Sequence, residues 1–435
     1  MKLGGRISAA IHVLDEVLAR RQPVRLAVRD WGKRARYAGA KDRAWVSGLV
    51  LDALRRKNSL ASAMGAGDPR ALVLGTLAFA WQMDPREIEM SAYEPHGPTP
   101  LSDGERQALA AVPETCGPLH VRGDFPEWLT AHMTRAFGEH AADEGAAMAR
   151  RAPVDIRVNT LKADAQRAER ALAPAGARAS ALLRNGLQIP APDPREREKS
   201  LEAIPAYSKG WVEVQDAGSQ IAAAAAGLGA GEQVLDFCAG GGGKTLAMAG
   251  AMAGKGQVFA HDIDARRLSA LIQRLKRSGA HNVQLVYPDT PGGLAPLEGQ
   301  MDCVFLDAPC SGTGTWRRKP DTKWRLSEKA LQRRVQEQAD ILRAGAAFVK
   351  PGGRLVYVTC SILIEEGEDR VGEFLSAQPG FRAESAADAA ISSGLLTEAG
   401  ARAVRAGEGP GGSVRLTPLQ AGTDGFFFAV LRRAR

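Results

Sequence analysis

The stretch EQVLDFCAGGGGKTLAMAG, residues 232–250, joins a short apolar run to an alanine-rich segment through four consecutive glycines, Gly240 to Gly243. The apolar run predicts a buried strand, and the segment after the glycines predicts a helix. Glycine lets the backbone approach a ligand closely, and the first turn of a helix offers unpaired N–H groups. The stretch therefore predicts a strand, a ligand-binding turn and a helix, as in an α/β fold.

The alternation of strands and helices continues through the rest of the sequence. Helical patterns occupy 265–279 and 328–349. Further strand patterns are GQVFAHDID (256–264), NVQLVYPD (282–289), MDCVFLDAPC (301–310), GGRLVYVTCS (352–361) and DGFFFAVLRR (424–433). Such alternation predicts a mostly parallel sheet with helices on both faces. In these sheets ligands bind beyond the carboxyl ends of the strands, which is where the chemically interesting side chains fall.

The patterns along the chain predict three domains. Residues 1–140 are mostly helical, residues 145–217 mix strand and helix patterns in a small α+β domain, and residues 218–435 form the α/β domain. The first 60 residues hold fourteen Lys or Arg and five Asp or Glu, a net charge of +9 against +8 for the whole chain. Either a solvated basic face or a nucleic-acid-binding surface explains this excess.

Composition excludes several classes of protein. The chain is 45% hydrophobic and 24% charged, which is typical of globular proteins. It contains no run of about 18 apolar residues, so we expect no membrane span. The five cysteines are odd in number and scattered, without the CxxC spacing of a metal site. We therefore expect no disulfide framework, no metal and a location in the reducing cytoplasm. We also expect a monomer.

Three kinds of cofactor compete for the glycine loop. A Walker A loop needs G-x-x-x-x-G-K-[ST]; Gly243–Thr245 fit its end, but Cys238 replaces its first glycine. With VFLDAP as a Walker B-like strand, a P-loop nucleotide hydrolase stays an alternative. A dinucleotide fingerprint fails because Thr245 takes the place of its last glycine. The third candidate is S-adenosylmethionine, whose ribose hydroxyls Asp262 would bind after the second strand.

Two cysteines follow strand ends, Cys310 in DAPCSGTG and Cys360 in VYVTCSI. Neighbouring strand ends of a doubly wound sheet can bring both thiols into one cleft. The alternative is that each is a small buried hydrophobe, as most free cysteines are. We favour that alternative for Cys238 and Cys303, whereas Cys116 has no functional context.

Two thiols, an acid and a methyl donor together suit one reaction. Carbon 5 of cytosine is a poor nucleophile until a thiolate adds to carbon 6 and gives an enamine-like adduct. The adduct takes the methyl group, and removal of the carbon 5 proton then lets the thiol leave. An acid near ring nitrogen 3 would take up the charge that develops there.

The motifs DAPCSGTG, VTCSI, LDFCAGGGGKT and GTDGFFFAVLRR resemble those of RNA 5-methylcytosine methyltransferases of the RsmB/Sun type, over about residues 145–435. The resemblance implies a Rossmann-like domain with a mostly parallel seven-stranded sheet and S-adenosylmethionine as cofactor. It implies that Cys360 is the nucleophile, that Cys310 assists product release, and that Asp307 contacts the target base and lies by the cofactor. Asp262 would hold the ribose. The methionine part would lie against Cys238, Ala239, Gly240, Gly241, Gly242, Gly243 and Lys244.

The sequence departs from the family pattern at three points. The usual loop has Ala-Pro where this chain has Gly240-Gly241. The family acid near the adenine has no clean equivalent; Asp289 is the nearest candidate and stands about two positions late. After Thr-Cys-Ser the family commonly has Glu-Glu-Asn, whereas this chain has Glu365–Gly367.

Bacterial relatives that modify small-subunit rRNA often carry a helical NusB-like RNA-binding domain, with which the basic residues 1–140 are compatible. The resemblance therefore implies a cytosine-5 methyltransferase of 16S rRNA, with tRNA as the alternative substrate. A P-loop nucleotide hydrolase and a non-catalytic RNA-binding protein are the alternatives from other classes. Arg317, Arg318 and Lys319 can meet RNA phosphates as the base enters the site.

Overall fold

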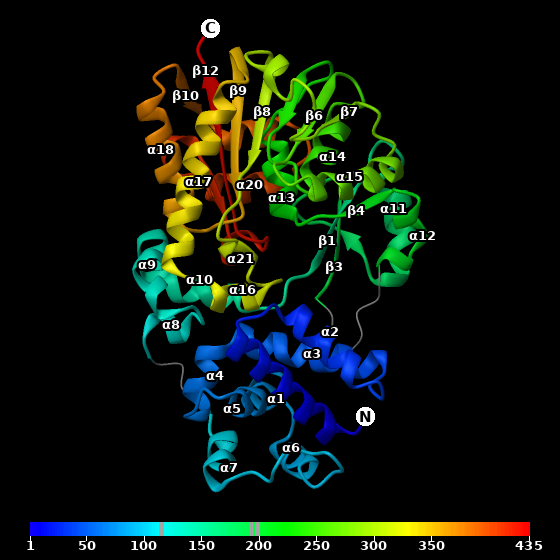
Figure 1. The fold of residues 1–435 in the computed structure, drawn as a ribbon, viewed down its shortest axis with the longest axis vertical. Coiled ribbons are helices and arrows are strands. Elements are labelled where there is room, and N and C mark those ends of the chain that lie inside the picture. The colour runs from blue at the N-terminus through cyan, green and yellow to red at the C-terminus, as the bar shows by residue number, and fades with distance from the viewer. Residues whose placement is uncertain (113–116, 192, 194, 196–200) are drawn as a thin grey trace. The chain divides into compact units, whose positions relative to one another are not determined.

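The structure is a computed structural model that describes residues 1–112, 117–191, 193, 195 and 201–435. Within these residues the chain forms two compact units, whose elements Figure 1 labels. Unit 1 comprises Met1–Arg151, Ala191–Lys199 and Thr315–Leu326. Unit 2 comprises Ala152–Pro190, Ser200–Gly314 and Ser327–Arg435. The division into three domains stays a prediction.

Unit 1 is helical in its described residues. Its helices before residue 150 are α1 (Leu3–Arg20), α2 (Val24–Arg34), α3 (Ala40–Arg55), α4 (Lys57–Met64), α5 (Pro69–Gly75), α6 (Pro85–Ser91), α7 (Asp103–Ala110), α8 (Leu119–Arg122), α9 (Thr130–Phe137) and α10 (Ala141–Met148). The apolar spacing of α1 explains its packing, because Ile7, Ala10 and Leu14 recur every three or four residues and are fully buried. They share one core with Leu49 and Leu54 of α3.

A second stretch of unit 1, Thr315–Leu326, carries the short helix α16 (Pro320–Arg325) and packs against α3. Lys323 is fully buried, and its Nζ donates a hydrogen bond to the Arg55 carbonyl oxygen at 3.0 Å. Burial lowers the pKa of Lys323 to about 8. The Arg55 guanidinium in turn donates to the Arg317 carbonyl oxygen at 2.7 Å. This stretch therefore completes the core of a unit from which it is far removed in sequence.

The basic residues that follow Cys310 are only partly exposed to solvent. Arg317 is 5% exposed, so the prediction that its side chain meets RNA phosphates is wrong. Lys319 is exposed and Arg318 is half-buried. Trp316 is fully buried, with the Lys323 ammonium 5.5 Å from its ring centroid. The burial of Trp316 within unit 1 thus keeps part of this basic run away from solvent.

Unit 2 contains a small antiparallel sheet of order β2-β3-β1-β4. Its strands are β1 (Val154–Val158), β2 (Arg178–Ala179), β3 (Gly186–Ile189) and β4 (Val212–Val214), and its helices are α11 (Ala165–Leu172) and α12 (Pro205–Ser208). Ile156 and Val158 of β1 lie in one core with Ala168 and Leu172 of α11. Asp164 caps α11 by accepting a hydrogen bond from the Arg167 N–H at 2.7 Å.

The larger sheet of unit 2 has the order β10-β12-β9-β8-β5-β6-β7, and β11 pairs with β12 beside this path. Its strands are β5 (Gln233–Asp236), β6 (Gln257–His261), β7 (Val283–Val286), β8 (Met301–Asp307), β9 (Val349–Thr359), β10 (Phe381–Glu384), β11 (Val414–Leu416) and β12 (Phe426–Arg433). Strands β5 to β9 pair in parallel, whereas β12 is antiparallel to β9, β10 and β11. The predicted mostly parallel, seven-stranded sheet is confirmed, with β11 as an additional short strand.

Alternate side chains of β8 enter two separate cores. Cys303 and Phe305 pack with α13 (Ala217–Ala224), α14 (Gly243–Ala251), α19 (Ala386–Ser392) and α20 (Glu398–Ala406). Val304 and Leu306 pack with α17 (Glu328–Ala346) and α18 (Glu368–Ala377). This is the two-residue period of a strand that is buried on both faces. Helix α15 (Ala265–Ser278) packs on α14 through a smaller apolar cluster, and the one-turn helix α21 (Pro418–Ala421) precedes β12.

The parallel strands end at one edge of the sheet. Strand β5 ends at Asp236, β6 at His261, β8 at Asp307 and β9 at Thr359. The glycine loop and both cysteine motifs therefore leave the sheet from the same edge. Among the helices of the described residues, none combines the length and the apolar character that a membrane crossing needs.

Candidate active site

The two cysteines that follow strand ends lie in contact. Strands β8 and β9 pair in parallel with Asp307 opposite Val358, so Cys310 and Cys360 leave the sheet side by side. Their sulfur atoms are 3.3 Å apart, and both residues are half-buried. The Gly314 N–H donates to the Cys360 carbonyl oxygen at 3.0 Å and fixes the loop after Cys310 to the end of β9.

Their surroundings make the two thiols unequal. The hydrogen bond from Cys310 lowers the pKa of Cys360, helped by the charge of Lys244 and opposed by burial and by Asp307. The same hydrogen bond, together with burial and the charge of Glu366, raises the pKa of Cys310. Cys360 therefore ionises first while Cys310 keeps its proton. The thiolate is the form of cysteine that attacks carbon.

An ion pair joins the glycine loop to the strand of Cys310. Lys244 Nζ donates to Asp307 Oδ2 at 2.7 Å. Burial alone would lower the pKa of Lys244, but the hydrogen bond and charge of Asp307, with the charges of Cys360 and Asp236, together outweigh burial and raise the pKa. Lys244 Nζ also lies 5.2 Å from the centroid of the Phe426 ring. The sequence predicts Lys244 in the cofactor loop, and the structure adds its bond to Asp307.

A buried glutamate that sequence reasoning left without a role holds the loop of Cys310. Glu366 is fully buried, and its carboxylate accepts hydrogen bonds from the Ser311 N–H at 2.7 Å and from the Ser311 hydroxyl. Gln338 Nε2 donates to the same carboxylate at 3.0 Å and to the Pro309 carbonyl oxygen at 2.9 Å. Glu366 follows Cys360 by six residues in the sequence and therefore ties the two cysteine loops together.

The neighbouring departure from the family motif has a steric reason. Gly367 stands where the family commonly has asparagine. An added Cβ at Gly367 would lie 2.9 Å from atoms of the Phe427 ring, which is closer than real Cβ atoms approach. The carbonyl oxygen of Glu366 accepts a hydrogen bond from the Tyr357 hydroxyl at 2.9 Å, which fixes the backbone here. The loop therefore passes too near the sheet for a larger residue.

Hydroxyl groups join the two cysteine loops a second time. Thr313 Oγ1 and Ser361 Oγ lie 3.0 Å apart, and both residues are fully buried. The Ile362 N–H donates to Thr313 Oγ1 at 3.1 Å, and the Leu363 N–H donates to Ser361 Oγ at 3.1 Å. These side chains therefore satisfy the buried backbone of the loop after Cys360.

The glycine loop follows β5 and depends on its glycines for packing as well as for shape. Gly240 and Gly242 have φ angles of 54° and 79°, in the left-handed region. A Cβ at Gly242 would lie 2.0 Å from Leu271 of α15, and one at Gly240 would lie 2.7 Å from the Arg267 guanidinium. The Gly241 carbonyl oxygen accepts a hydrogen bond from Arg274 at 2.6 Å. Helix α15 therefore requires the loop to be free of side chains at these points.

Asp262, predicted to hold a ribose, lies directly against the glycine loop. One carboxylate oxygen accepts from the Gly240 N–H at 2.9 Å, and the other accepts from the Asp264 N–H at 2.9 Å. Arg267 forms an ion pair with Asp262 at 3.2 Å, and the Asp262 side chain is 3% exposed. A ligand hydroxyl that reaches this carboxylate therefore competes with Arg267.

The remaining predicted residues differ in exposure. Asp289 is exposed in a turn after β7, and Ala239 is buried in the turn after β5. Burial raises the pKa of Cys238, and it raises the pKa of Cys303 to about 11, so neither thiol ionises at neutral pH. Cys116 lies outside the described residues.

Asp236, the last residue of β5, is a further buried acid that the sequence analysis did not single out. Thr245 Oγ1 donates to its Oδ2 at 2.6 Å. Its Oδ1 is buried and has no hydrogen-bond partner within the part of the chain that the structure describes. Burial raises the pKa of Asp236 to about 7. A charged residue at the very end of an apolar strand, directly before a glycine loop, is the signal that could have identified it.

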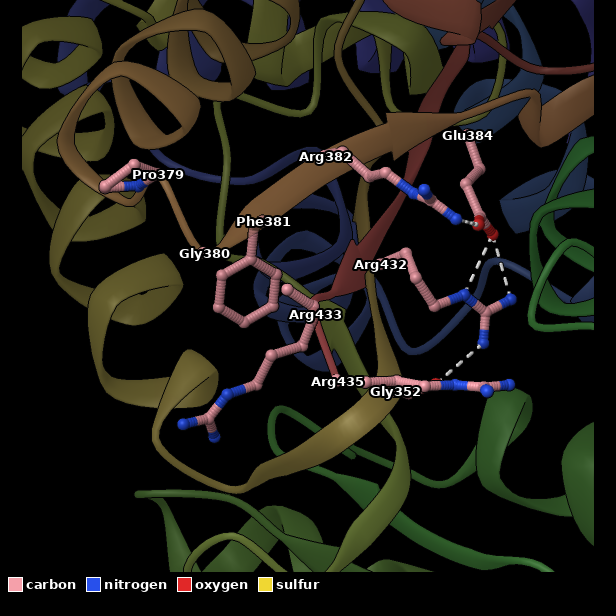
Figure 2. A pocket seen from close by; sticks show the side chains of 10 residues that line it. Gly352, Pro379, Gly380, Phe381, Arg382, Glu384, Arg432, Arg433 and Arg435 are labelled. Carbon is pink, nitrogen blue, oxygen red and sulfur yellow. Dashed lines mark hydrogen bonds and ion pairs between the residues drawn. The ribbon is translucent and has the colours of Figure 1, made fainter.

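A separate cavity of about 590 Å³ lies at the other ends of the strands, where β9 begins and β12 ends. Figure 2 shows Arg382 and Arg432 converging on Glu384 in this cavity. Arg432 also donates to the Gly352 carbonyl oxygen at 3.2 Å, and its hydrogen bond lowers the pKa of Glu384. The predicted site residues are absent from its lining, so the cavity is distinct from the thiol site.

The sequence is similar to families of known proteins. Residues 226–432 match the family model described as 16S rRNA methyltransferase RsmB/F, and residues 125–194 match that of an RsmF/B-like ferredoxin-like domain. A ribosomal RNA small subunit methyltransferase B from Salmonella newport (strain SL254) is 38% identical over 250 residues, which are 56% of this chain and 50% of the relative. The homologue from Salmonella heidelberg (strain SL476) has the same identity and coverage. The chain thus spans about half the length of these curated relatives.

Solved structures share the fold. The crystal structure of PH0851 matches with a TM-score of 0.73 and 25% identity over 100% of both chains. NSun6 from Pyrococcus horikoshii, solved with SFG, matches with a TM-score of 0.61 and 22% identity over 72% of this chain and 99% of its own. A methyltransferase homolog protein from Pyrococcus horikoshii matches with a TM-score of 0.56 and 25% identity over 72% and 97% of the two chains. The larger sheet with its helices is the Rossmann-like fold of S-adenosylmethionine-dependent methyltransferases.

Proposed function

Because residues 226–432 match the family model of 16S rRNA methyltransferases RsmB/F, we propose that the protein transfers a methyl group from S-adenosylmethionine to carbon 5 of a cytosine in RNA, with 16S rRNA as the substrate. One observation carries the proposal: the sulfur atoms of Cys310 and Cys360 lie 3.3 Å apart, beside the ion pair of Lys244 and Asp307. A thiol pair next to an acid suits covalent activation of the pyrimidine ring.

Cys360 is the nucleophile in this proposal. Its pKa is lowered by the hydrogen bond from Cys310 and by the charge of Lys244, so its thiolate is the first to form. The thiolate adds to carbon 6 of the cytosine, and the negative charge moves into the ring toward carbon 5 and nitrogen 3. The base has to be unpaired or turned out of its stack to come within reach.

Asp307 and Lys244 act on the charge that the addition creates. Asp307 ends β8 three residues before Cys310, and its side chain is 34% exposed although one oxygen is bound by Lys244. A carboxyl group at this place can form a hydrogen bond with the nitrogen 3 side of the ring. The buried Lys244 ammonium keeps a positive charge beside both Asp307 and Cys360. The charge of Lys244 therefore stabilises the anionic adduct.

Cys310 assists release of the product. After methylation and loss of the carbon 5 proton, the Cys360 sulfur has to leave carbon 6. Cys310 lies at hydrogen-bond distance from that sulfur and has a raised pKa, so it holds the proton that a departing thiolate can share. The hydrogen bonds of Glu366 to Ser311 keep Cys310 at this distance.

The residues around the glycine loop fit S-adenosylmethionine, which when bound would supply the methyl group. The unpaired, buried Asp236 Oδ1 beside the loop calls for a donor, and the ammonium group of the cofactor's methionine part would meet that need directly or through water. Asp262 would take the ribose hydroxyls once Arg267 moves aside. The loop from Cys238 to Lys244 would line the methionine part, and Asp289 is the candidate acid near the adenine.

The partner in this proposal is RNA. Arg25, Arg29 and Lys33 are exposed on α2 at intervals of four residues, which places them on one face of the helix. Tyr37 follows at the same interval and is 75% exposed, which suits stacking on an unpaired base. Basic side chains with an exposed aromatic ring are the pattern expected of an RNA-binding surface.

The test offers 16S rRNA and tRNA to the purified protein with labelled S-adenosylmethionine and locates the product by bisulfite sequencing. We expect label at carbon 5 of a cytosine in 16S rRNA. Label in tRNA alone would support the tRNA alternative. Binding of ATP but not S-adenosylmethionine, measured by titration calorimetry, would favour the P-loop hydrolase. RNA binding without any transfer would favour a non-catalytic RNA-binding protein.

A further inference from the structure

We propose that Cys310 and Cys360 also form a redox-active dithiol, which a hydroperoxide converts to an intramolecular disulfide and a thiol reductant restores. This chemistry goes beyond methyl transfer and does not depend on it. The carrying observation is geometric: the two sulfur atoms, on the ends of adjacent parallel strands, are already 3.3 Å apart. A disulfide has an S–S length of about 2.05 Å, so the sulfur atoms need to close by only about 1.2 Å.

The loops that carry the two sulfur atoms are fixed to each other. Glu366 holds the Cys310 loop at Ser311, and Thr313 bonds to Ser361 at 3.0 Å directly after Cys360. These contacts keep the thiols facing each other. An oxidised Cys360 therefore has its partner thiol beside it and need not wait for a large movement.

The pair differs from the other described cysteines. Cys238 and Cys303 have raised pKa values because they are buried, and thiols of that kind react slowly with peroxides. Cys360 combines a lowered pKa with partial exposure, which is the pattern of oxidation-sensitive cysteines, and Cys310 takes the place of a resolving thiol. The structure therefore assigns the oxidation to one pair.

The reaction balances in two steps. The Cys360 thiolate attacks one peroxide oxygen; an S–O bond forms, the O–O bond breaks, and the other oxygen leaves as hydroxide. The sulfur loses two electrons to the peroxide and becomes a sulfenic acid. The Cys310 sulfur then attacks the Cys360 sulfur; the S–S bond forms, the S–O bond breaks, and water leaves with the Cys310 proton. A dithiol such as dithiothreitol reverses the result by exchange.

The disulfide removes the nucleophile from the site. Neither cysteine can then add to a cytosine or assist its release, so RNA methylation would stop until the disulfide is reduced. In return, the disulfide protects Cys360 from the sulfinic and sulfonic acids, which thiols do not reverse. Reversible formation of the disulfide thus prevents the permanent loss of the Cys360 thiol.

The experiment exposes the full-length protein carrying Cys116→Ser to hydrogen peroxide and counts thiols after denaturation. Four cysteines remain in this variant, five less one. We expect two titratable thiols after oxidation, a mass lower by two hydrogen atoms, and one cross-linked peptide pair that contains Cys310 and Cys360. Dithiothreitol should restore all four thiols. In the Cys310→Ser variant, dimedone should label Cys360, and prolonged peroxide should give a sulfinic acid that dithiothreitol does not reverse.

The matched control is Cys303→Ala, in which disulfide formation should be unchanged. The proposal is overturned if all four thiols survive an excess of peroxide, if a different pair is linked, or if Cys360 of the parent protein goes directly to the sulfinic acid. Circular dichroism of each variant before oxidation shows whether it is folded. Should Cys310→Ser not fold, peptide mapping of the parent protein alone decides the proposal. All readouts are thiol chemistry, so they stand or fall separately from methyl transfer.

Discussion

Lys244 Nζ lies 2.7 Å from Asp307 Oδ2, and this hydrogen bond joins the first turn of α14 to the end of β8. Local sequence patterns place Lys244 in a loop that is expected to bind the cofactor. They place Asp307 in a motif that is expected to contact the target cytosine. Their contact makes the two motifs parts of one charged site beside Cys360.

Lys244→Met should make Cys360 less reactive at neutral pH. Lys244 lowers the pKa of Cys360, so removal of its charge raises that pKa and leaves less thiolate. The rate of Cys360 alkylation by iodoacetamide at pH 7 should fall about threefold to tenfold, with the midpoint of its pH profile displaced upward. Lys255→Met, an exposed lysine after α14, should leave the profile unchanged. An identical midpoint in both variants would mean that Lys244 does not influence the thiol.

Substitution of each thiol should separate attack from release. Cys360→Ala should be inactive and should form no covalent complex with RNA, because the nucleophile is missing. Cys310→Ala should attack and methylate, then stall, and accumulate a protein–RNA adduct that survives denaturing gel electrophoresis. An adduct in the Cys360 variant but not in the Cys310 variant would reverse the roles. Full turnover in both would exclude covalent catalysis by these thiols.

Asp262→Ala should weaken S-adenosylmethionine binding by about 1–3 kcal/mol, the cost of losing hydrogen bonds to a charged group. Titration calorimetry measures the change, and RNA affinity is the internal control. Arg267→Ala should act in the opposite direction, because Arg267 covers the Asp262 carboxylate at 3.2 Å and competes with a ribose. Equal cofactor affinity in Asp262→Ala and the parent protein would mean that the ribose binds at a different residue.

Glu366→Gln should loosen the Cys310 loop and reduce stability. The substitution gives the buried side chain a donor where Ser311 and Gln338 already donate, so at least one hydrogen bond is lost. We expect a loss of about 1–3 kcal/mol in the free energy of unfolding, measured with urea. Glu398→Gln, whose side chain is 95% exposed, should change it by less than about 0.5 kcal/mol. Unchanged stability and turnover in Glu366→Gln would exclude the positioning role.

Charge reversal of the α2 face should weaken RNA binding in a salt-dependent way. The triple variant Arg25→Glu, Arg29→Glu, Lys33→Glu removes three phosphate contacts in our proposal. The slope of log affinity against log salt should become shallower by about 2 for single-stranded RNA. Arg402→Glu, an exposed arginine of α20, is the control in unit 2. A slope equal to that of the parent protein would show that the basic face is exposed to solvent and does not contact RNA phosphates. Deletion of residues 1–140 is a poorer test, because Lys323 would lose its buried partner Arg55.

The sequence was sufficient for the parallel strands of the sheet and for the two thiols. Buried parallel strands are apolar runs, so β5, β6, β8 and β9 are visible in the sequence, and their order brings Cys310 and Cys360 to adjacent ends. Strands β10 and β11 were not predicted, since they are short and depend on pairing with β12. Gln338 and Glu366 were missed because a polar side chain acquires such a role only when distant loops meet around it.

The place of Thr315–Leu326 could not be predicted either. Its tryptophans and charges have no helical or strand period, and the segment is enclosed on both sides by sequence of unit 2. The contacts of Lys323 and Trp324 with Arg55 and Leu54 of α3 assign it to unit 1. Local pattern indicates which elements form, whereas membership of a core is settled by the tertiary contacts.

That segment has a consequence for synthesis on the ribosome. Domains generally fold as units from the N-terminus as the chain emerges. The helices up to Met148 emerge early, but the segment Thr315–Leu326, which carries Trp316 and Lys323, is translated only after strands β1 to β8 of unit 2. Unit 1 therefore acquires its last contacts with α3, such as the hydrogen bond from Lys323 to Arg55, only when β8 and the Cys310 motif have already been made.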